Sequence, residues 1–94
     1  STMERLPDEE VQAAAEVLGW ERRDDRLVRV YEHPDFGRAM EFVNTVAQLA
    51  EATNHHPDIA IRWNKVELAL WTHTAGGVTA ADVEMAGAID GLRS

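Results

Sequence analysis

Two segments of the chain place apolar residues at helical spacing. Between about residues 8 and 18, three acidic residues open the segment and Gly19 follows it, as is typical of the two ends of a helix. The apolar stripe over residues 36–52 is the clearest in the chain, and Asp35 before it suits a helix N-cap. We therefore expect a helix over each segment.

Alternation of apolar and polar residues predicts four strands outside these helices. Turn residues at 24–25 connect the first two strands, and turn residues at 64–65 connect the last two. Pro57 lies in the loop before the second pair and disfavours a helix there. The predicted strands cover residues 20–23, 26–32, 59–64 and 66–71.

A third helix is expected to follow Thr79, a typical N-cap residue, and to run to about residue 92. Asp82 lies three residues after Thr79, close to the spacing of a capping box. The resulting order, α-β-β-α-β-β-α, predicts an α+β fold with a four-stranded antiparallel sheet and three helices packed on one face.

The length of 94 residues suits a single domain. We expect this domain to span residues 3–94, because Ser1 and Thr2 before Met3 are typical of an expression-tag remnant. The core of so small a domain is modest, which favours self-association. The chain has no cysteine, so a disulfide or a thiolate metal site is ruled out.

The formal net charge of −8 argues against a nucleic-acid partner, which would need a basic surface. No stretch approaches the roughly 20 apolar residues that a membrane span requires. We see no secretory signal either. A cytoplasmic location, without a membrane partner, is therefore expected.

Three of the four histidines lie near a predicted helix end and a predicted strand end. His55 and His56 follow Glu51 closely, and His73 follows the last strand. Histidine exchanges protons near neutral pH, because its unperturbed pKa is about 6.5. Glu51 and His55 are four residues apart and could lie on adjacent helical turns. Neighbouring extended residues point to opposite sides, so His55 and His56 are expected to differ in role.

These residues belong to a longer set of short motifs with a fixed order. The motifs are Leu18-Gly19-Trp20, Asp35-Phe36-x-Arg38-Ala39, Glu51-x-x-x-His55-His56-Pro57, Trp63-Asn64-Lys65-Val66, Thr72-His73, Gly76-Gly77 and Asp82. Together they resemble the pterin-4a-carbinolamine dehydratase family, also known as a dimerization cofactor of a hepatocyte nuclear factor. The resemblance covers nearly the whole chain.

The resemblance implies roles for seven residues. Catalytic roles fall to His55, His56 and His73, and substrate-binding or orienting roles to Glu51, Trp20, Asp82 and Trp63. The family often has Tyr where this chain has Trp63, so an aromatic ring is kept and a hydroxyl is lost.

The resemblance also implies an activity. The family removes water from 4a-hydroxy-tetrahydrobiopterin to give quinonoid dihydropterin, which recycles tetrahydrobiopterin after an aromatic amino acid hydroxylase has used it. An acid and a base suffice for this reaction, so we expect neither a metal nor another cofactor. We expect His55 and His73 to share the proton transfers, with His56 and Glu51 orienting the substrate or tuning the histidines. A homodimer or homotetramer is also implied.

Two other functions stay open. His55, His56, His73 and Glu51 carry donor atoms that zinc accepts, although adjacent histidines chelate one ion awkwardly. Alternatively, the chain is a non-catalytic dimerization or assembly factor, or a coactivator, built on the same fold. The presence of all three motif histidines argues against a pure scaffold.

Overall fold

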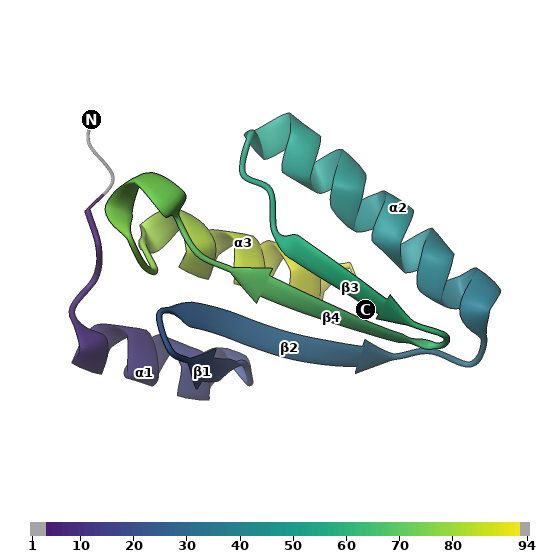
Figure 1. Ribbon diagram of the computed structural model, residues 1–94, viewed down its shortest axis with the longest axis horizontal. Coiled ribbons are helices and arrows are strands. Elements are labelled where there is room, and N and C mark those ends of the chain that lie inside the picture. The colour runs from purple at the N-terminus through teal and green to yellow at the C-terminus, as the bar shows by residue number, and fades with distance from the viewer. Residues whose placement is uncertain (1–3, 93–94) are drawn as a thin grey trace.

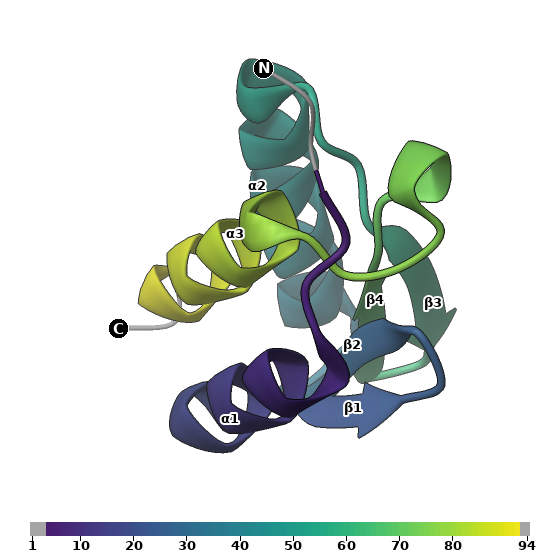
Figure 2. The same ribbon diagram turned by 90° about the vertical axis from the view of Figure 1, so that its left-hand side faces the viewer.

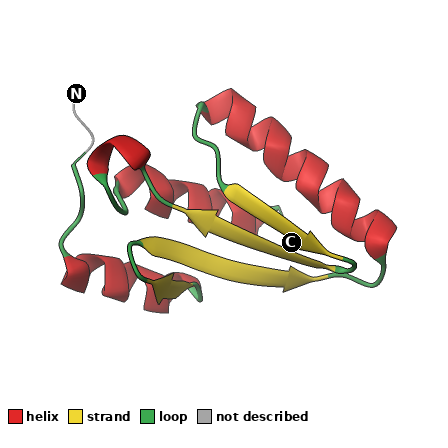
Figure 3. Cartoon of the chain, in the orientation of Figure 1, coloured by secondary structure: helices red, strands yellow, loops and turns green. Residues whose placement is uncertain are grey.

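The computed structural model describes residues 4–92, so the expected tag remnant lies outside the described residues (Figure 1). Within this range the predicted order α-β-β-α-β-β-α is confirmed, with one short 3-10 turn before the last helix (Figure 3). The elements are α1 (Asp8–Leu18), β1 (Glu21–Arg23), β2 (Arg26–Glu32), α2 (Phe36–Thr53), β3 (Asp58–Arg62), β4 (Lys65–Leu70), η1 (His73–Ala75) and α3 (Ala80–Gly91).

The strands of residues 4–92 form one antiparallel sheet in the order β1-β2-β4-β3. Asp58, the first residue of β3, pairs with Ala69, the last residue but one of β4. Because the two strands are antiparallel, the chain just before β3 and the chain just after β4 meet at the same end of the sheet. These two segments carry the three motif histidines.

All three helices cover one face of the sheet, as predicted (Figure 2). Alternate residues of the two central strands point into this layer, so they form the core with the helices. The fully or nearly fully buried apolar side chains on these elements are Ala15, Leu27, Tyr31, Ala39, Val46, Val66, Leu68, Leu70, Ala86 and Ile89. No helix within the described residues is long and apolar enough to span a membrane.

The turn between β3 and β4 differs from the expectation. Arg62 pairs with Lys65, so the turn consists of Trp63 and Asn64, and Trp63 does not belong to the strand. Trp63 has a φ of 52°, in the left-handed region that an extended strand cannot contain. Asn64 is bonded to His33 twice: its side chain donates to the His33 carbonyl at 2.9 Å, and its own carbonyl accepts from the His33 N–H at 2.8 Å. These two bonds hold the turn against the β2–α2 connection.

The position of the core predicts a mutational effect. Leu68 is fully buried in a central strand, so we expect Leu68→Ala to lower the free energy of unfolding by about 2–5 kcal/mol. Val17 on α1 is 88% exposed, and Val17→Ala should change it by less than about 0.5 kcal/mol. Urea unfolding followed by circular dichroism measures both values. Similar losses in the two variants would contradict this assignment of the core.

Candidate active site

The end of α2 fixes the backbone of His55. Asn54 follows the helix in the left-handed conformation, with a φ of 54°, which asparagine tolerates better than most residues. The N–H groups of both Asn54 and His55 donate to the carbonyl of Ala50. The helix therefore stops abruptly, and His55 leaves it in a direction set by two backbone hydrogen bonds.

The ring of His55 meets a fully buried carboxylate. His55 Nε2 lies 2.5 Å from Oδ1 of Asp82, whose side chain has no exposed surface. Oδ2 of Asp82 accepts hydrogen bonds from the Thr79 backbone N–H at 2.9 Å and from the Thr72 hydroxyl at 2.8 Å. Asp82 is also the third residue of α3, close to the positive end of the helix dipole. These partners replace the water that the carboxylate loses on burial.

The hydrogen bonds around Asp82 allow the hydrogens to be assigned. In the capping box, the Thr79 hydroxyl oxygen accepts from the Asp82 N–H, and its own hydrogen can go to Thr72 Oγ1 at 2.9 Å or to Asp82 Oδ2 at 3.4 Å. Thr72 in turn donates to Asp82, so the carboxylate acts as an acceptor throughout. We infer that the hydrogen shared with His55 belongs to Nε2 and that Nδ1 carries the lone pair when the ring is neutral.

His56 has a carboxylate partner of its own. Its Nε2 is hydrogen-bonded to Oε2 of Glu51. The spacing of four residues predicted Glu51 beside His55, on adjacent helical turns, but Glu51 pairs with His56 instead. The reason is the left-handed Asn54, which ends the helix before His55 and removes the helical spacing on which that expectation relied. The side chains of Glu51 and His56 are 77% and 55% exposed, so solvent weakens this pair.

His73 is the first residue of η1, and its side chain is exposed. Its imidazole stacks on the indole of Trp71, with ring centroids 4.0 Å apart and planes tilted by 31°. Thr72, the residue between them, is the buried donor to Asp82. The backbone of His73 is therefore tied through its neighbour to the same carboxylate that holds His55.

Trp20 lies in a different polar cluster. It is 4% exposed, and its Nε1–H donates to both carboxylate oxygens of Asp90, at 3.3 and 3.2 Å. Asp90 also accepts from Arg29 at 3.1 Å and from the Tyr31 hydroxyl. Asp90 is eight residues after Asp82 on α3, which is about 12 Å along a helix. Within the chain, the structure therefore does not bring Trp20 to the histidines.

Trp63 also lies away from the three histidines. It occupies the turn at the far end of the β3–β4 hairpin and is 66% exposed. The five residues of β3 separate it from the histidine end, a length of about 17 Å for a strand. Within one chain, the structure therefore does not bring Trp63 to the histidines.

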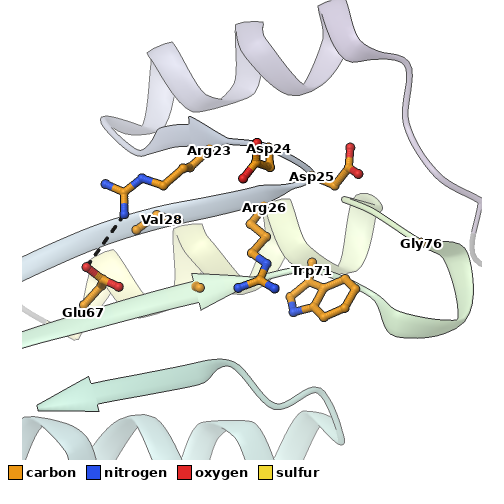
Figure 4. Close-up of a pocket in the computed structure, with 9 residues that line it drawn as sticks. Arg23, Asp24, Asp25, Arg26, Val28, Glu67, Trp71 and Gly76 are labelled. Carbon is orange, nitrogen blue, oxygen red and sulfur yellow. Dashed lines mark ion pairs between the residues drawn. The ribbon is translucent and has the colours of Figure 1, made fainter.

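Two hollows border the site. One, of about 340 Å³, lies between the end of α2 and α3 and is lined by His55, Asn54 and Met85 among others. That volume is near the lower end of the range for small-molecule pockets, about 300–1,000 Å³. The other, of about 260 Å³, lies on the helix-free face of the sheet and includes Trp71 (Figure 4). The hydrogen bond and charge of Glu21 raise the pKa of Arg23 there, so that guanidinium stays charged.

A metal site requires several ligand atoms directed at one point. Within residues 4–92 no group of three or more histidine, aspartate or glutamate side chains is arranged to hold an ion. His55 and His56 each direct Nε2 to a different carboxylate. The geometry gives no support to the alternative of a metal site.

The fold and the site define a class: a small α+β protein with two carboxylate–histidine pairs suited to moving protons. A family model described as pterin 4 alpha carbinolamine dehydratase matches residues 4–92. The chain belongs to the pterin-4a-carbinolamine dehydratase family, as the sequence motifs predicted.

Similar sequences agree with this assignment. A protein from Thermomicrobium roseum is 52% identical over 85 residues, which cover 89% of this chain and 91% of that protein. A protein from a Roseiflexus species is 46% identical over 87 residues, covering 92% and 94%. Both are provisionally named pterin-4-alpha-carbinolamine dehydratase.

Solved structures share the fold. A transcriptional coactivator/pterin dehydratase from Brucella melitensis matches with a TM-score of 0.89 and 32% identity, over 96% of this chain and 99% of that one. A pterin dehydratase-like RuBisCO assembly factor of the alpha-carboxysome matches with a TM-score of 0.66 and 24% identity, over 78% and 87%. The second likeness concerns the fold alone.

The hydrogen assignment around Asp82 predicts the behaviour of Asp82→Asn. The asparagine oxygen must accept from Thr79 and Thr72, so its NH₂ group must face His55 Nε2. We expect neutral His55 to change from the Nε2–H to the Nδ1–H tautomer, as measured by ¹H–¹⁵N correlation spectra of the imidazole. Glu51→Gln is the matched control and should leave the His55 signals unchanged. An Nε2–H tautomer of His55 in Asp82→Asn would contradict the assignment.

Proposed function

We propose that the protein dehydrates 4a-hydroxy-tetrahydropterins, such as 4a-hydroxy-tetrahydrobiopterin, to quinonoid dihydropterins by histidine general acid–base catalysis. It would thereby return a used pterin cofactor to the recycling route that serves an aromatic amino acid hydroxylase. The single observation that supports this most is the hydrogen bond from His55 to the buried carboxylate of Asp82. A histidine held in one orientation and one tautomer is the arrangement that directed proton transfer needs.

The reaction balances with two proton transfers, one to the leaving hydroxyl and one from N5, and needs no other reagent. A catalytic acid gives a proton to the hydroxyl on C4a, and the C4a–O bond breaks to release water. The lone pair of N5 forms the N5=C4a double bond, and a base then takes the proton from N5. The proton from the acid leaves in the water molecule, and the base holds the proton from N5. One proton passed from the base back to the acid, through solvent, restores both groups.

We propose the role of each residue from the exposure and the hydrogen-bond partners of its side chain. We assign the proton transfers to His55, through the free Nδ1, and to exposed His73. His56 and Glu51 then orient the substrate, because their exposed pair can yield to a ligand at little cost. Asp82 acts on His55 and does not touch the reacting atoms. This reaction needs neither a metal nor another cofactor, and we expect it to take place in the cytoplasm.

The proposal predicts the kinetic effect of removing each ring. Wild-type protein should accelerate the dehydration of synthetic 4a-hydroxy-tetrahydropterin, followed by absorbance. We expect His55→Ala and His73→Ala each to lower the rate by at least about 10²-fold. His33→Gln is the matched control, because His33 lies against Phe42 outside the site, and its rate should stay at the wild-type value. Near-wild-type turnover in both alanine variants, with circular dichroism showing intact folds, would contradict the mechanism.

A non-catalytic role as an assembly factor or coactivator is the second candidate. It is favoured by the name of the Brucella melitensis protein, a transcriptional coactivator/pterin dehydratase, and by the apolar edge of the sheet. A folded sample that does not accelerate dehydration would make this candidate the leading one.

We further propose that the chain forms a homodimer or homotetramer through such an edge. β3 is an outer strand, and Ile59 and Ile61 on it are 37% and 39% exposed. An edge strand offers unpaired backbone groups, and a second copy of the chain can satisfy them.

This edge can be tested with one charge. We expect Ile61→Lys to lower the mass measured by sedimentation, because a lysine on an edge strand opposes pairing. Val17→Lys is the matched control, since Val17 on α1 is 88% exposed and lies outside the sheet, and it should leave the mass unchanged. Val30→Lys tests the other free edge, because Val30 is 48% exposed and lies beyond the three residues of β2 that pair with β1. Dissociation caused by Val30→Lys alone would assign the interface to the edge of β2 instead of β3, and a monomeric wild type would contradict self-association.

A further inference from the structure

Trp71 is an aromatic residue to which neither the motifs nor the proposed mechanism assign a role. It follows β4 and lies on the helix-free face of the sheet (Figure 4). Its indole is in contact with the ring of His73, with centroids 4.0 Å apart. It is half-buried, and its ring therefore has a protein side and a solvent side.

The neighbouring strand β2 holds the indole from one side. The pairing of Leu27 with Leu70 places Arg26 directly opposite Trp71 in the continued register. The guanidinium carbon of Arg26 lies over the indole at 4.9 Å from its centroid, a cation–π contact. Figure 4 shows the two side chains next to each other in the hollow of this face.

The other neighbouring strand, β3, holds the indole by a hydrogen bond. Trp71 Nε1–H donates to Oδ2 of Asp58 at 3.2 Å. Asp58 is the first residue of β3 and comes two residues after His56. The indole thus connects the segment that carries His55 and His56 with the segment that carries His73.

We propose that Trp71 is a positioning residue that sets the orientation of His73 toward the His55–His56 segment. The proposal rests on the proposed function, because it assigns the stack a part in that reaction. An exposed histidine in a 3-10 turn would otherwise sample several side-chain rotamers. The stack restricts the imidazole to orientations that keep it against a ring held in place by Arg26 and Asp58. Misplacement of a catalytic group by about 1 Å can cost about 10²-fold in rate.

The test measures the ring stack by NMR and the reaction by kinetics, so that the two can be compared in each variant. Proton NMR of His73 reports the stack directly, because an indole face shifts imidazole signals upfield. We expect Trp71→Ala to abolish this shift and to lower kcat by between about 10-fold and 10²-fold, with KM nearly unchanged. Trp71→Phe keeps a stacking face and should restore both the shift and most of kcat. Asp58→Ala should weaken both, and Val30→Ala, on the same face, should change neither.

Each outcome decides a different point. If the wild type shows no dehydration but His73 shows the upfield shift, the proposed function fails while the stack stands, and the positioning role falls with the function. If the wild type is active and Trp71→Ala loses the shift but keeps kcat, the positioning role alone is overturned. If Trp71→Ala does not fold, Trp71→Phe and Asp58→Ala decide the question: a kcat that does not follow the His73 shift in these variants overturns the proposal.

Discussion

The geometry of the site depends on one buried carboxylate. A charge without exposed surface must be fully hydrogen-bonded, because removal of one partner of a buried pair costs about 3–5 kcal/mol. The partners of Asp82 come from three segments: His55 after α2, Thr72 after β4, and Thr79 before α3. A displacement of any one segment would leave the carboxylate unsatisfied. Asp82 therefore fixes these segments relative to one another, and two of them carry or adjoin the histidines.

Local signals in the sequence predicted the helices, the order of elements along the chain and the capping role of Asp82, but neither the order of strands in the sheet nor the contact of Asp82 with His55. Apolar spacing and capping residues act within a few positions, so α1, α2 and the capping box of α3 were readable directly. The contact of Asp82 with His55 spans 27 residues and depends on how the end of α2 meets the start of α3. No local pattern carries that information. The family motifs named both residues without pairing them.

The tryptophans show where sequence reasoning stops. A tryptophan with its N–H bonded suits a core or a pocket equally well, and Trp20 is buried beside Asp90. Trp63 continues an apolar alternation and was therefore predicted in the strand, with the turn at residues 64–65. The turn instead consists of Trp63 and Asn64, and two hydrogen bonds join Asn64 to His33. The stack of Trp71 on His73 forms after β4 has ended at Leu70. A spacing of two residues in the sequence indicates only a shared face of a strand.

The two carboxylate–histidine pairs are alike in chemistry and opposite in environment. Asp82 has no exposed surface, whereas the side chain of Glu51 is 77% exposed. Water competes for the exposed pair, so His56 and Glu51 can separate and re-form at little cost. His55 cannot leave its carboxylate without stranding a buried charge. Adjacent histidines in the sequence are therefore not duplicates: one is a fixed ring with a single free nitrogen, and the other is a group that can rearrange around a ligand. This asymmetry is the physical basis of our proposal that His55 carries out the directed proton transfer and that His56 accommodates the substrate.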